Sequence, residues 1–263
     1  MAETGLSMTS RSDRLRQWAV TVGFVAGLIG TLAGLGIIGT QVQNSAGGAL
    51  RADATLLTPA SQAFSIWSVI YVGLVGYVIW QWLPAQAHSR TARATGWWAA
   101  ASLLLNGAWL GVTQAGWLWV SVLVIALLAY VLGRLCLNLV GHGPHSLAEL
   151  LVVYVTFGLY LGWVCVATVA NVTAAAVGTG VRLGAAERIV AVIVLLVAGA
   201  LGVFLSRRMP GQYAIGVAMA WGLAWIAIGR LLVQPQSLVV GTVAAVVAAG
   251  VLAAHLLSAR VRA

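Results

Sequence analysis

Residues 160–171 read Tyr160-Leu-Gly-Trp163-Val-Cys-Val-Ala167-Thr-Val-Ala-Asn171. At about 3.6 residues per turn, Tyr160, Trp163, Ala167 and Asn171 share one face of a helix. The apolar run around them, residues 148–174, exceeds the roughly 20 residues that cross a bilayer. Because an amide in lipid needs a partner inside a bundle, Asn171 is expected to point toward other helices. The stretch therefore predicts a membrane helix with one aromatic and polar face turned inward.

The composition of the whole chain agrees with a membrane protein. Of its 263 residues, 61% are hydrophobic and 7% are charged, whereas soluble domains carry about 45–50% and about 25%. Such a chain has too few polar residues to cover a soluble core, and it is too apolar for disorder. We therefore expect an all-α integral membrane protein whose partner is the lipid bilayer.

Apolar runs predict about eight spanning helices. Two of them carry start signals: Thr58-Pro59 is typical of an N-cap followed by proline in the first turn, before the second helix. Ser146 and Glu149 have the spacing of a capping box at the start of the fifth. The expected helices are residues 18–38, 63–83, 97–113, 117–139, 148–174, 186–206, 212–231 and 239–257.

All 14 basic residues are arginines, so chemistry that needs a lysine Schiff base is excluded. The arginines stand singly or in pairs at the ends of apolar runs, which indicates lipid head-group anchors and not nucleic-acid contacts. With eight helices, one side holds Arg11, Arg14, Arg16, Arg90, Arg93, Arg134, Arg207, Arg208, Arg260 and Arg262, and the other holds Arg51, Arg182, Arg188 and Arg230. This bias predicts that both termini are cytoplasmic.

Two other predicted helices repeat the pattern of rings and amides at helical spacing. The second carries Phe64, Trp67 and Tyr71, and the third carries Asn106 and Trp109. Hydrogen-bonded packing between helices explains this spacing, and so does an aromatic ligand pocket. On spacing alone, both interpretations stay open. Glycines four apart, Gly23 with Gly27 and Gly30 with Gly34, likewise suit either packing within the chain or dimerisation.

Three motifs together resemble a known family. Residues 160–171 resemble the fifth helix of the TspO/MBR family, the tryptophan-rich sensory proteins, which reads Y-L-x-W-V-x-x-A-T-x-x-N. Leu105-Asn106-Gly107-Ala108-Trp109 resembles its third-helix L-N-x-x-W, and Thr58-Pro59 with the rings that follow resembles the start of its second helix. The resemblance covers residues 18–174, and this chain adds three helices.

The resemblance implies a five-helix bundle whose aromatic pocket binds porphyrins or other flat, sterol-like hydrophobic ligands. We accordingly expect a cytoplasmic tail at 1–17, the bundle at 18–174, and a three-helix extension with a short tail at 175–263. Family members often dimerise, so a second copy is a candidate partner. Carried over by position, the ligand-binding candidates are Trp67, Tyr71, Asn106, Trp109, Tyr160, Trp163, Ala167 and Asn171.

The function implied by the resemblance is a membrane receptor or carrier, with a bound tetrapyrrole as the candidate cofactor, in a bacterial cell membrane. A small-molecule transporter and a porphyrin-modifying enzyme are the alternatives. No catalytic constellation is visible in the sequence, so we expect no enzyme activity. His142, His145 and Glu149 lie close together in the sequence, but capping explains Glu149 better than a metal does. We expect no metal site and no nucleic-acid partner.

Overall fold

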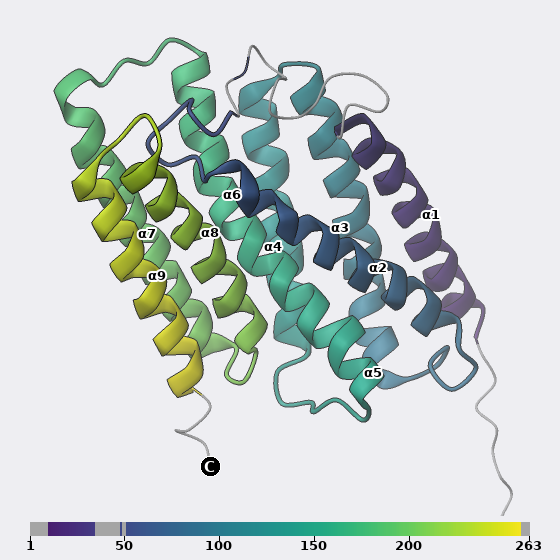
Figure 1. Cartoon of the computed structure of the whole chain (residues 1–263). Coiled ribbons are helices and arrows are strands. Elements are labelled where there is room, and N and C mark those ends of the chain that lie inside the picture. The colour runs from purple at the N-terminus through teal and green to yellow at the C-terminus, as the bar shows by residue number, and fades with distance from the viewer. Residues whose placement is uncertain (1–9, 35–47, 49–50, 259–263) are drawn as a thin grey trace, which may run out of the picture.

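The computed structural model describes residues 10–34, 48 and 51–258, and all regular structure within them is helical (Figure 1). The fold class is as expected, with eight long helices in this part of the chain. The short elements are η3 (Ser61–Ser65), α5 (Leu147–Glu149), η4 (Leu150–Val155) and η5 (Gly184–Ala186). The long helices are α1 (Arg11–Gly34), α2 (Ile66–Trp82), α3 (Arg90–Gln114), α4 (Leu118–Asn138), α6 (Thr156–Gly178), α7 (Glu187–Arg208), α8 (Tyr213–Leu232) and α9 (Leu238–Ser258).

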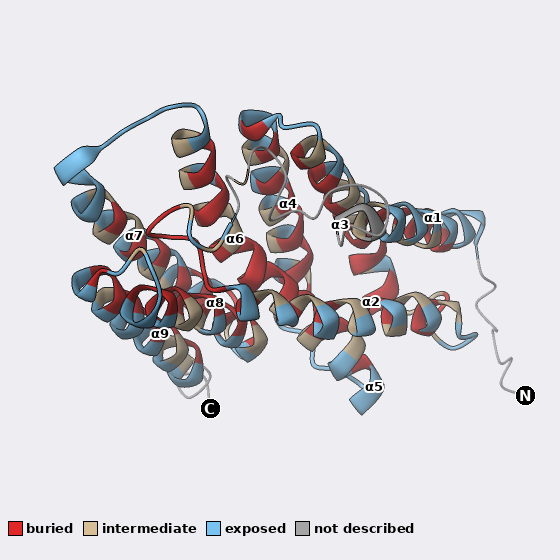
Figure 2. Cartoon of the chain, turned by 45° about the horizontal axis from the view of Figure 1, so that its top comes forward, coloured by how far each residue is buried: buried red, intermediate tan, exposed pale blue. Residues whose placement is uncertain are grey.

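Six helical segments of the described chain are long and apolar enough to cross a membrane. The buried residues lie where the helices face one another, and exposed residues lie on the outer faces (Figure 2). The exposed residues include large apolar side chains such as Val72 and Leu123. This distribution suits a bundle surrounded by lipid. The six segments are Ser61–Trp82, Leu118–Asn138, Leu147–Gly178, Gly184–Arg208, Tyr213–Leu232 and Leu238–Ser258.

Two helices begin earlier than the apolar runs predict. α1 begins at Arg11 and not at residue 18, because Ser10 Oγ accepts a hydrogen bond from the Asp13 N–H at 3.1 Å. α3 begins at Arg90 and not at residue 97, because Ser89 Oγ accepts from the Ala92 N–H at 3.1 Å. Serine side chains satisfy the free N–H groups of a first turn, so polar residues extend both helices. The expected tail at 1–17 is therefore helical from residue 11.

The start of the second helix also differs from the prediction. Thr58 does not cap it: its hydroxyl bonds the Thr55 hydroxyl at 2.8 Å, and α2 begins at Ile66, after the 3₁₀ turn η3. Residues 35–47 and 49–50, which include the predicted end of the first helix, lie outside the described residues, as do Arg260 and Arg262.

α5, η4 and α6 form one continuous helix of 32 residues. Ser146 Oγ accepts from the Glu149 N–H at 3.1 Å, which confirms half of the predicted capping box. The Glu149 carboxylate accepts from the His145 N–H at 2.9 Å instead of from Ser146. η4 is a π-helical turn, and Thr156 Oγ1 donates to the Leu151 carbonyl five residues earlier at 2.8 Å. Such a turn accommodates one extra residue without ending the helix.

The glycine pattern of α1 serves packing inside the chain. A Cβ added at Gly23 or Gly27 would lie 3.1 Å from the carbonyl oxygen of Ala100 or Leu103 in α3, and one at Gly30 would lie 3.2 Å from Gly107 Cα. These distances are tighter than most real Cβ contacts. The small residues therefore allow α1 and α3 to approach closely, as in other membrane bundles.

The C-terminal helices pack directly on the long helix α6. A Cβ at Gly158 would lie 2.8 Å from Ala214 Cβ of α8, and a Cβ at Gly222 of α8 would lie 2.8 Å from the Val166 side chain of α6. α9 in turn packs on α7 and α8. The division of the chain at residues 174 and 175 stays a prediction, and the two parts share this close helix contact.

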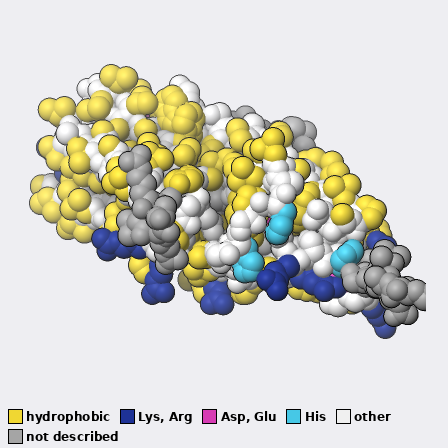
Figure 3. Space-filling model, turned by 90° about the horizontal axis from the view of Figure 1, so that it is seen from below, with side chains coloured by type: hydrophobic (Ala, Val, Ile, Leu, Met, Phe, Trp, Pro, Cys, Tyr) yellow, Lys and Arg dark blue, Asp and Glu magenta, His cyan; other side chains and the backbone are white. Residues whose placement is uncertain are grey.

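The beginning of α1 and the end of α9 lie at the same end of the bundle (Figure 1). Seen from that end, basic side chains spread across the face (Figure 3). Exposed arginines of the α1 start, the α3 start and the α7 end belong to this face: Arg11, Arg14, Arg90, Arg207 and Arg208. The arrangement matches an even number of long helices with basic ends on one side.

Candidate functional site

Aromatic rings from η3, α2 and α6 form one cluster between these elements. Trp67 stacks on Tyr71 with ring centroids 5.4 Å apart, and it meets the edges of Tyr160 at 5.7 Å and Trp163 at 6.3 Å. Phe64 adds a further edge contact to Trp163 at 5.6 Å. We call Phe64, Trp67, Tyr71, Tyr160 and Trp163 the ring cluster. Such offset and edge-to-face pairs contribute about 0.5–1.5 kcal/mol each beyond their buried area.

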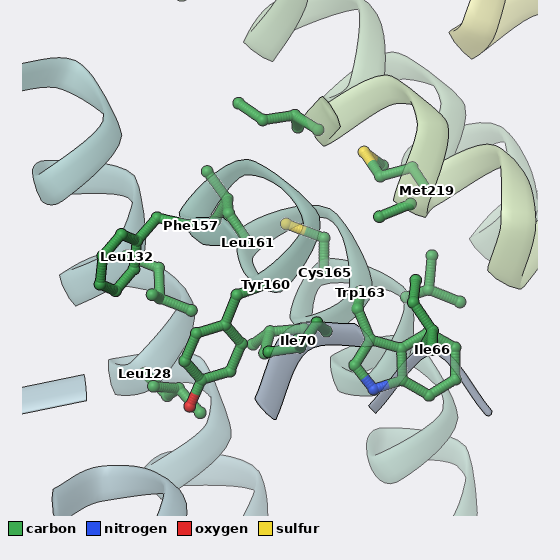
Figure 4. Packing of buried hydrophobic residues seen from close by; sticks show 14 of the residues in the cluster. Ile66, Ile70, Leu128, Leu132, Phe157, Tyr160, Leu161, Trp163, Cys165 and Met219 are labelled. Atoms are coloured by element: carbon green, nitrogen blue, oxygen red, sulfur yellow. The ribbon is translucent and has the colours of Figure 1, made fainter. Parts of the chain in front are cut away.

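The helix periodicity explains why the two α6 rings meet α2. Tyr160 and Trp163 are three residues apart, so both side chains leave α6 on the side where Ile66 and Ile70 of α2 lie (Figure 4). Tyr160 is fully buried and Trp163 is 1% exposed. Trp67 and Tyr71 are half-buried. The ring cluster is thus closed around Trp163 and more open along α2.

Asn106 joins the ring cluster through Tyr71. The Asn106 amide donates from Nδ2 to the Tyr71 hydroxyl at 3.0 Å, and that hydroxyl also lies 2.6 Å from Thr31 Oγ1 of α1. Tyr160 also bonds α3, the helix that carries Asn106: its hydroxyl donates to the Ser102 carbonyl at 3.4 Å. Two further helices, α1 and α3, therefore position the polar edge of the cluster.

Trp109 and Asn171 form a second group with α4. The Trp109 indole N–H donates to Asn171 Oδ1 at 3.4 Å, and Asn171 Nδ2 donates to Ser121 Oγ at 2.9 Å. Asn171 lies eight residues after Trp163, which places it about 12 Å further along the helix. Ala167 is half-buried midway between them. The hydrogen bonds of Asn171 are those expected of a packing residue that holds three helices together.

Two buried polar atoms at the ring cluster have no hydrogen-bond partner among the described residues. One is the Trp163 indole nitrogen, which is a donor, and the other is Asn106 Oδ1, which is an acceptor. An unpaired buried group costs about 1–3 kcal/mol. One free donor and one free acceptor beside stacked rings suit a flat ligand that carries both kinds of group.

Of the eight candidate positions, the structure brings four into direct ring contact and links Asn106 to them. Trp109 and Asn171 contact each other, and Ala167 separates the two groups. Thr31 and Ser121 could not be predicted as partners, because a lone hydroxyl in an apolar helix carries no signal of its own. Phe64 belongs to the aromatic pattern of the second predicted helix, but its spacing alone does not place it in the site.

The segment that carries Phe64 is held in place by α8. The Trp221 indole N–H donates to the Ala63 carbonyl at 2.9 Å, and the Ala60 N–H donates to the Trp225 carbonyl at 3.2 Å. These partners are more than 150 residues apart, so no local pattern could have indicated them. The C-terminal helices therefore position part of the ring cluster from outside the first five helices.

Metal-ligating side chains do not gather in the described part of the chain: no group of three or more His, Cys, Asp or Glu could hold an ion there. His145 Nδ1 lies 3.2 Å from Glu149 Oε2, which caps the helix. Cys136 and Cys165 are buried free thiols.

The comparisons with known proteins found one family. A family model described as TSPO-like protein matches residues 17–257, which is nearly the whole chain and includes the three C-terminal helices. No curated protein and no solved structure matched.

Proposed function

The chain belongs to the family of TSPO-like proteins, and on that premise we propose that it is a membrane receptor or carrier that binds a flat, porphyrin-type ligand at the ring cluster. The observation that carries the proposal is the unpaired Trp163 donor and Asn106 acceptor beside the stacked Trp67 and Tyr71 rings. A planar macrocycle stacks on indole and phenol rings, and its polar substituents pair with the two free groups. The proposed activity is ligand binding, because the aromatic rings can stack on a flat ligand and the amide and indole groups can form hydrogen bonds with it.

A ligand reaches the ring cluster from the half-buried side of α2. Trp67, Tyr71 and Ala167 are each partly exposed, whereas Trp163 is enclosed. Ala167 is the small residue next to Trp163 on the same face of α6, and it leaves room for the plane of a ligand. We expect the Trp163 ring to shift when the ligand enters.

The proposal is tested by titrating protoporphyrin IX into the protein in nanodiscs and following the porphyrin absorbance band. This signal stays usable when a tryptophan is removed. Trp163→Ala should weaken binding by about 1 kcal/mol or more, which is about fivefold. Trp163→Phe keeps a ring and loses the N–H, so it separates stacking from hydrogen bonding. Ala167→Phe should weaken binding by filling the space beside the rings.

Trp98→Ala is the matched control. Trp98 lies near the basic end of α3, with the Arg134 guanidinium 5.8 Å from its ring, and none of the aromatic ring pairs of the cluster includes it. Its loss should leave porphyrin affinity unchanged. If Trp163→Ala and Ala167→Phe both bind as the unchanged protein does, the ring cluster is packing only and the proposal is wrong.

A further inference from the structure

A second candidate site lies at the end of the bundle opposite the α1 start, between α8 and the segment that precedes α2. This segment passes over the end of α8 (Figure 1). A cavity of about 410 Å³ lies there, and its polar lining comes from Arg51, Asp53, Ser61, Gln62, Arg230 and Gln234. That volume is within the range of small-molecule sites, which is about 300–1,000 Å³.

Arg230 is the unusual member of this lining. It is 1% exposed, and its Nη1 and Nη2 donate to the carbonyls of Thr55 at 3.1 Å and Ala52 at 3.0 Å. Its Nε has no partner, and no carboxylate of the described residues lies within ion-pair distance of it. The two carbonyl groups accept hydrogen bonds from the terminal nitrogens but form no ion pair with the positive charge, and a buried charge without an ion pair is costly.

The second arginine of the cavity is free to change partners. Arg51 pairs with Asp53 through Nε at 3.1 Å and Nη2 at 3.3 Å, and both side chains are more than half exposed. Exposed pairs of this kind contribute about 1 kcal/mol or less. The cavity therefore has one positive charge in excess, and a competing anion can take Arg51 from Asp53 at little cost.

Neutral donors complete the lining. The Ser61 hydroxyl and the Gln62 amide stand at the start of η3, and Gln234 follows α8. We propose that this cavity binds a small molecule through a carboxylate or phosphate group, with the charges of Arg230 and Arg51 as the recognition elements. The residues differ from those of the ring cluster, so the proposal does not depend on porphyrin binding.

The test uses the full chain in phosphatidylcholine nanodiscs, with succinate and inorganic phosphate as probes and sodium chloride at matched ionic strength as the reference. The midpoint of thermal unfolding and calorimetric titration report binding. Both probes should raise the midpoint above that in chloride. Arg51→Gln should weaken binding about tenfold or more, because a charge-assisted hydrogen bond is lost. This exposed position should tolerate the change.

Arg188→Gln is the matched control, since Arg188 is an exposed arginine at the start of α7, at the same end of the bundle and outside the cavity. It should bind both probes as the unchanged protein does. Arg230→Met should abolish binding if it folds, and Arg230→Lys, which retains the charge, should restore part of it.

A parallel set of nanodiscs contains phosphatidylglycerol. If stabilisation needs this lipid and is lost in Arg51→Gln but not in Arg188→Gln, the bound group is a lipid phosphate and the same recognition chemistry holds. If neither the soluble anions nor the lipid stabilises the protein in a manner that depends on Arg51, the cavity is not an anion site and Arg230 only ties the 52–55 segment to α8.

Discussion

Arg93 of α3 holds the Asp13 carboxylate of α1 with two hydrogen bonds, from Nε to Oδ1 at 2.9 Å and from Nη2 to Oδ2 at 2.7 Å. Arg16 adds a third bond to Oδ1 at 2.7 Å, and its other terminal nitrogen donates to the Ala87 carbonyl. Gly96 gives the Arg16 side chain room against α3. The start of α1 is thereby fixed to the loop between α2 and α3 by a buried ionic group.

Asp13→Asn should destabilise the protein by about 3–5 kcal/mol, because it leaves the buried Arg16 guanidinium without its counter-charge. Chemical unfolding in detergent, followed by circular dichroism, measures the change. Asp53→Asn is the control, because it removes only an exposed pair with Arg51, and it should cost about 1 kcal/mol or less. Equal losses in the two variants would show that burial of the Asp13 group contributes nothing.

The same group makes stability depend on pH on the acidic side. The hydrogen bonds from Arg93 hold the pKa of Asp13 well below its ordinary value, against burial, which raises it. A lowered pKa stabilises the folded protein fully above the ordinary value of about 4, and this contribution is lost progressively as the pH falls below it. The free energy of unfolding, measured between about pH 6 and about pH 3, should fall more steeply with acid for the unchanged protein than for Asp13→Asn. Parallel curves would contradict the assignment.

Gly162→Ala should destabilise the contact between α6 and α8. The added methyl group would fall against the Ile215 carbonyl oxygen and lie 2.9 Å from Ala218 Cβ. Overpacking of this kind costs about 1–3 kcal/mol. Gly133→Ala in α4 meets nothing within 4 Å, so it should be neutral or stabilise by up to about 1 kcal/mol through helix propensity. The thermal unfolding midpoints of the two variants test this prediction. If Gly162→Ala is as stable as Gly133→Ala, the contact between α6 and α8 is not tightly packed and the prediction is wrong.

Reporter fusions should place both termini in the cytoplasm. The beginning of α1 and the end of α9 share the basic end of the bundle (Figure 1), and such ends stay on the cytoplasmic side. Fusions after residue 263 and within 85–95 should be active there, and one within 45–55 should report the outside. A C-terminal fusion that reports the outside would rule out this arrangement.

The eight long helices could be predicted as apolar runs, and the six candidate spans among the described residues have the length that a bilayer requires. The starts of α1 and α3 could not. Asp13 is helical and buried because Arg93, 80 residues away, pairs with its carboxylate, and Asp13 in turn pairs with the buried Arg16. A local pattern of charges indicates only a solvated tail. The last three helices begin and end within two residues of the predicted boundaries, because among the described residues there no distant ion pair extends a helix.

The candidate site was predictable to the same extent. Helical spacing placed Tyr160 and Trp163 on one face, and their contact with Trp67 agrees with it. The hydrogen bond between Trp221 and Ala63 could not be foreseen, because it joins helices that no repeat or spacing relates. The Arg230 cavity could not be predicted for a similar reason, because its lining joins segments that are distant in the sequence. The sequence alone indicates that Arg230 is one of several lipid head-group anchors.

The π-helical turn η4 bears on how this chain should be compared with its relatives. One extra residue in a helix turns everything before it by about 100° relative to everything after it. A relative with a regular helix here would carry one residue fewer between the Ser146 cap and Tyr160 while keeping both on their present faces. Alignments of this region should therefore admit a single-residue gap within residues 150–155, and the ring positions of α6 should be matched by counting back from Asn171 instead of forward from the cap.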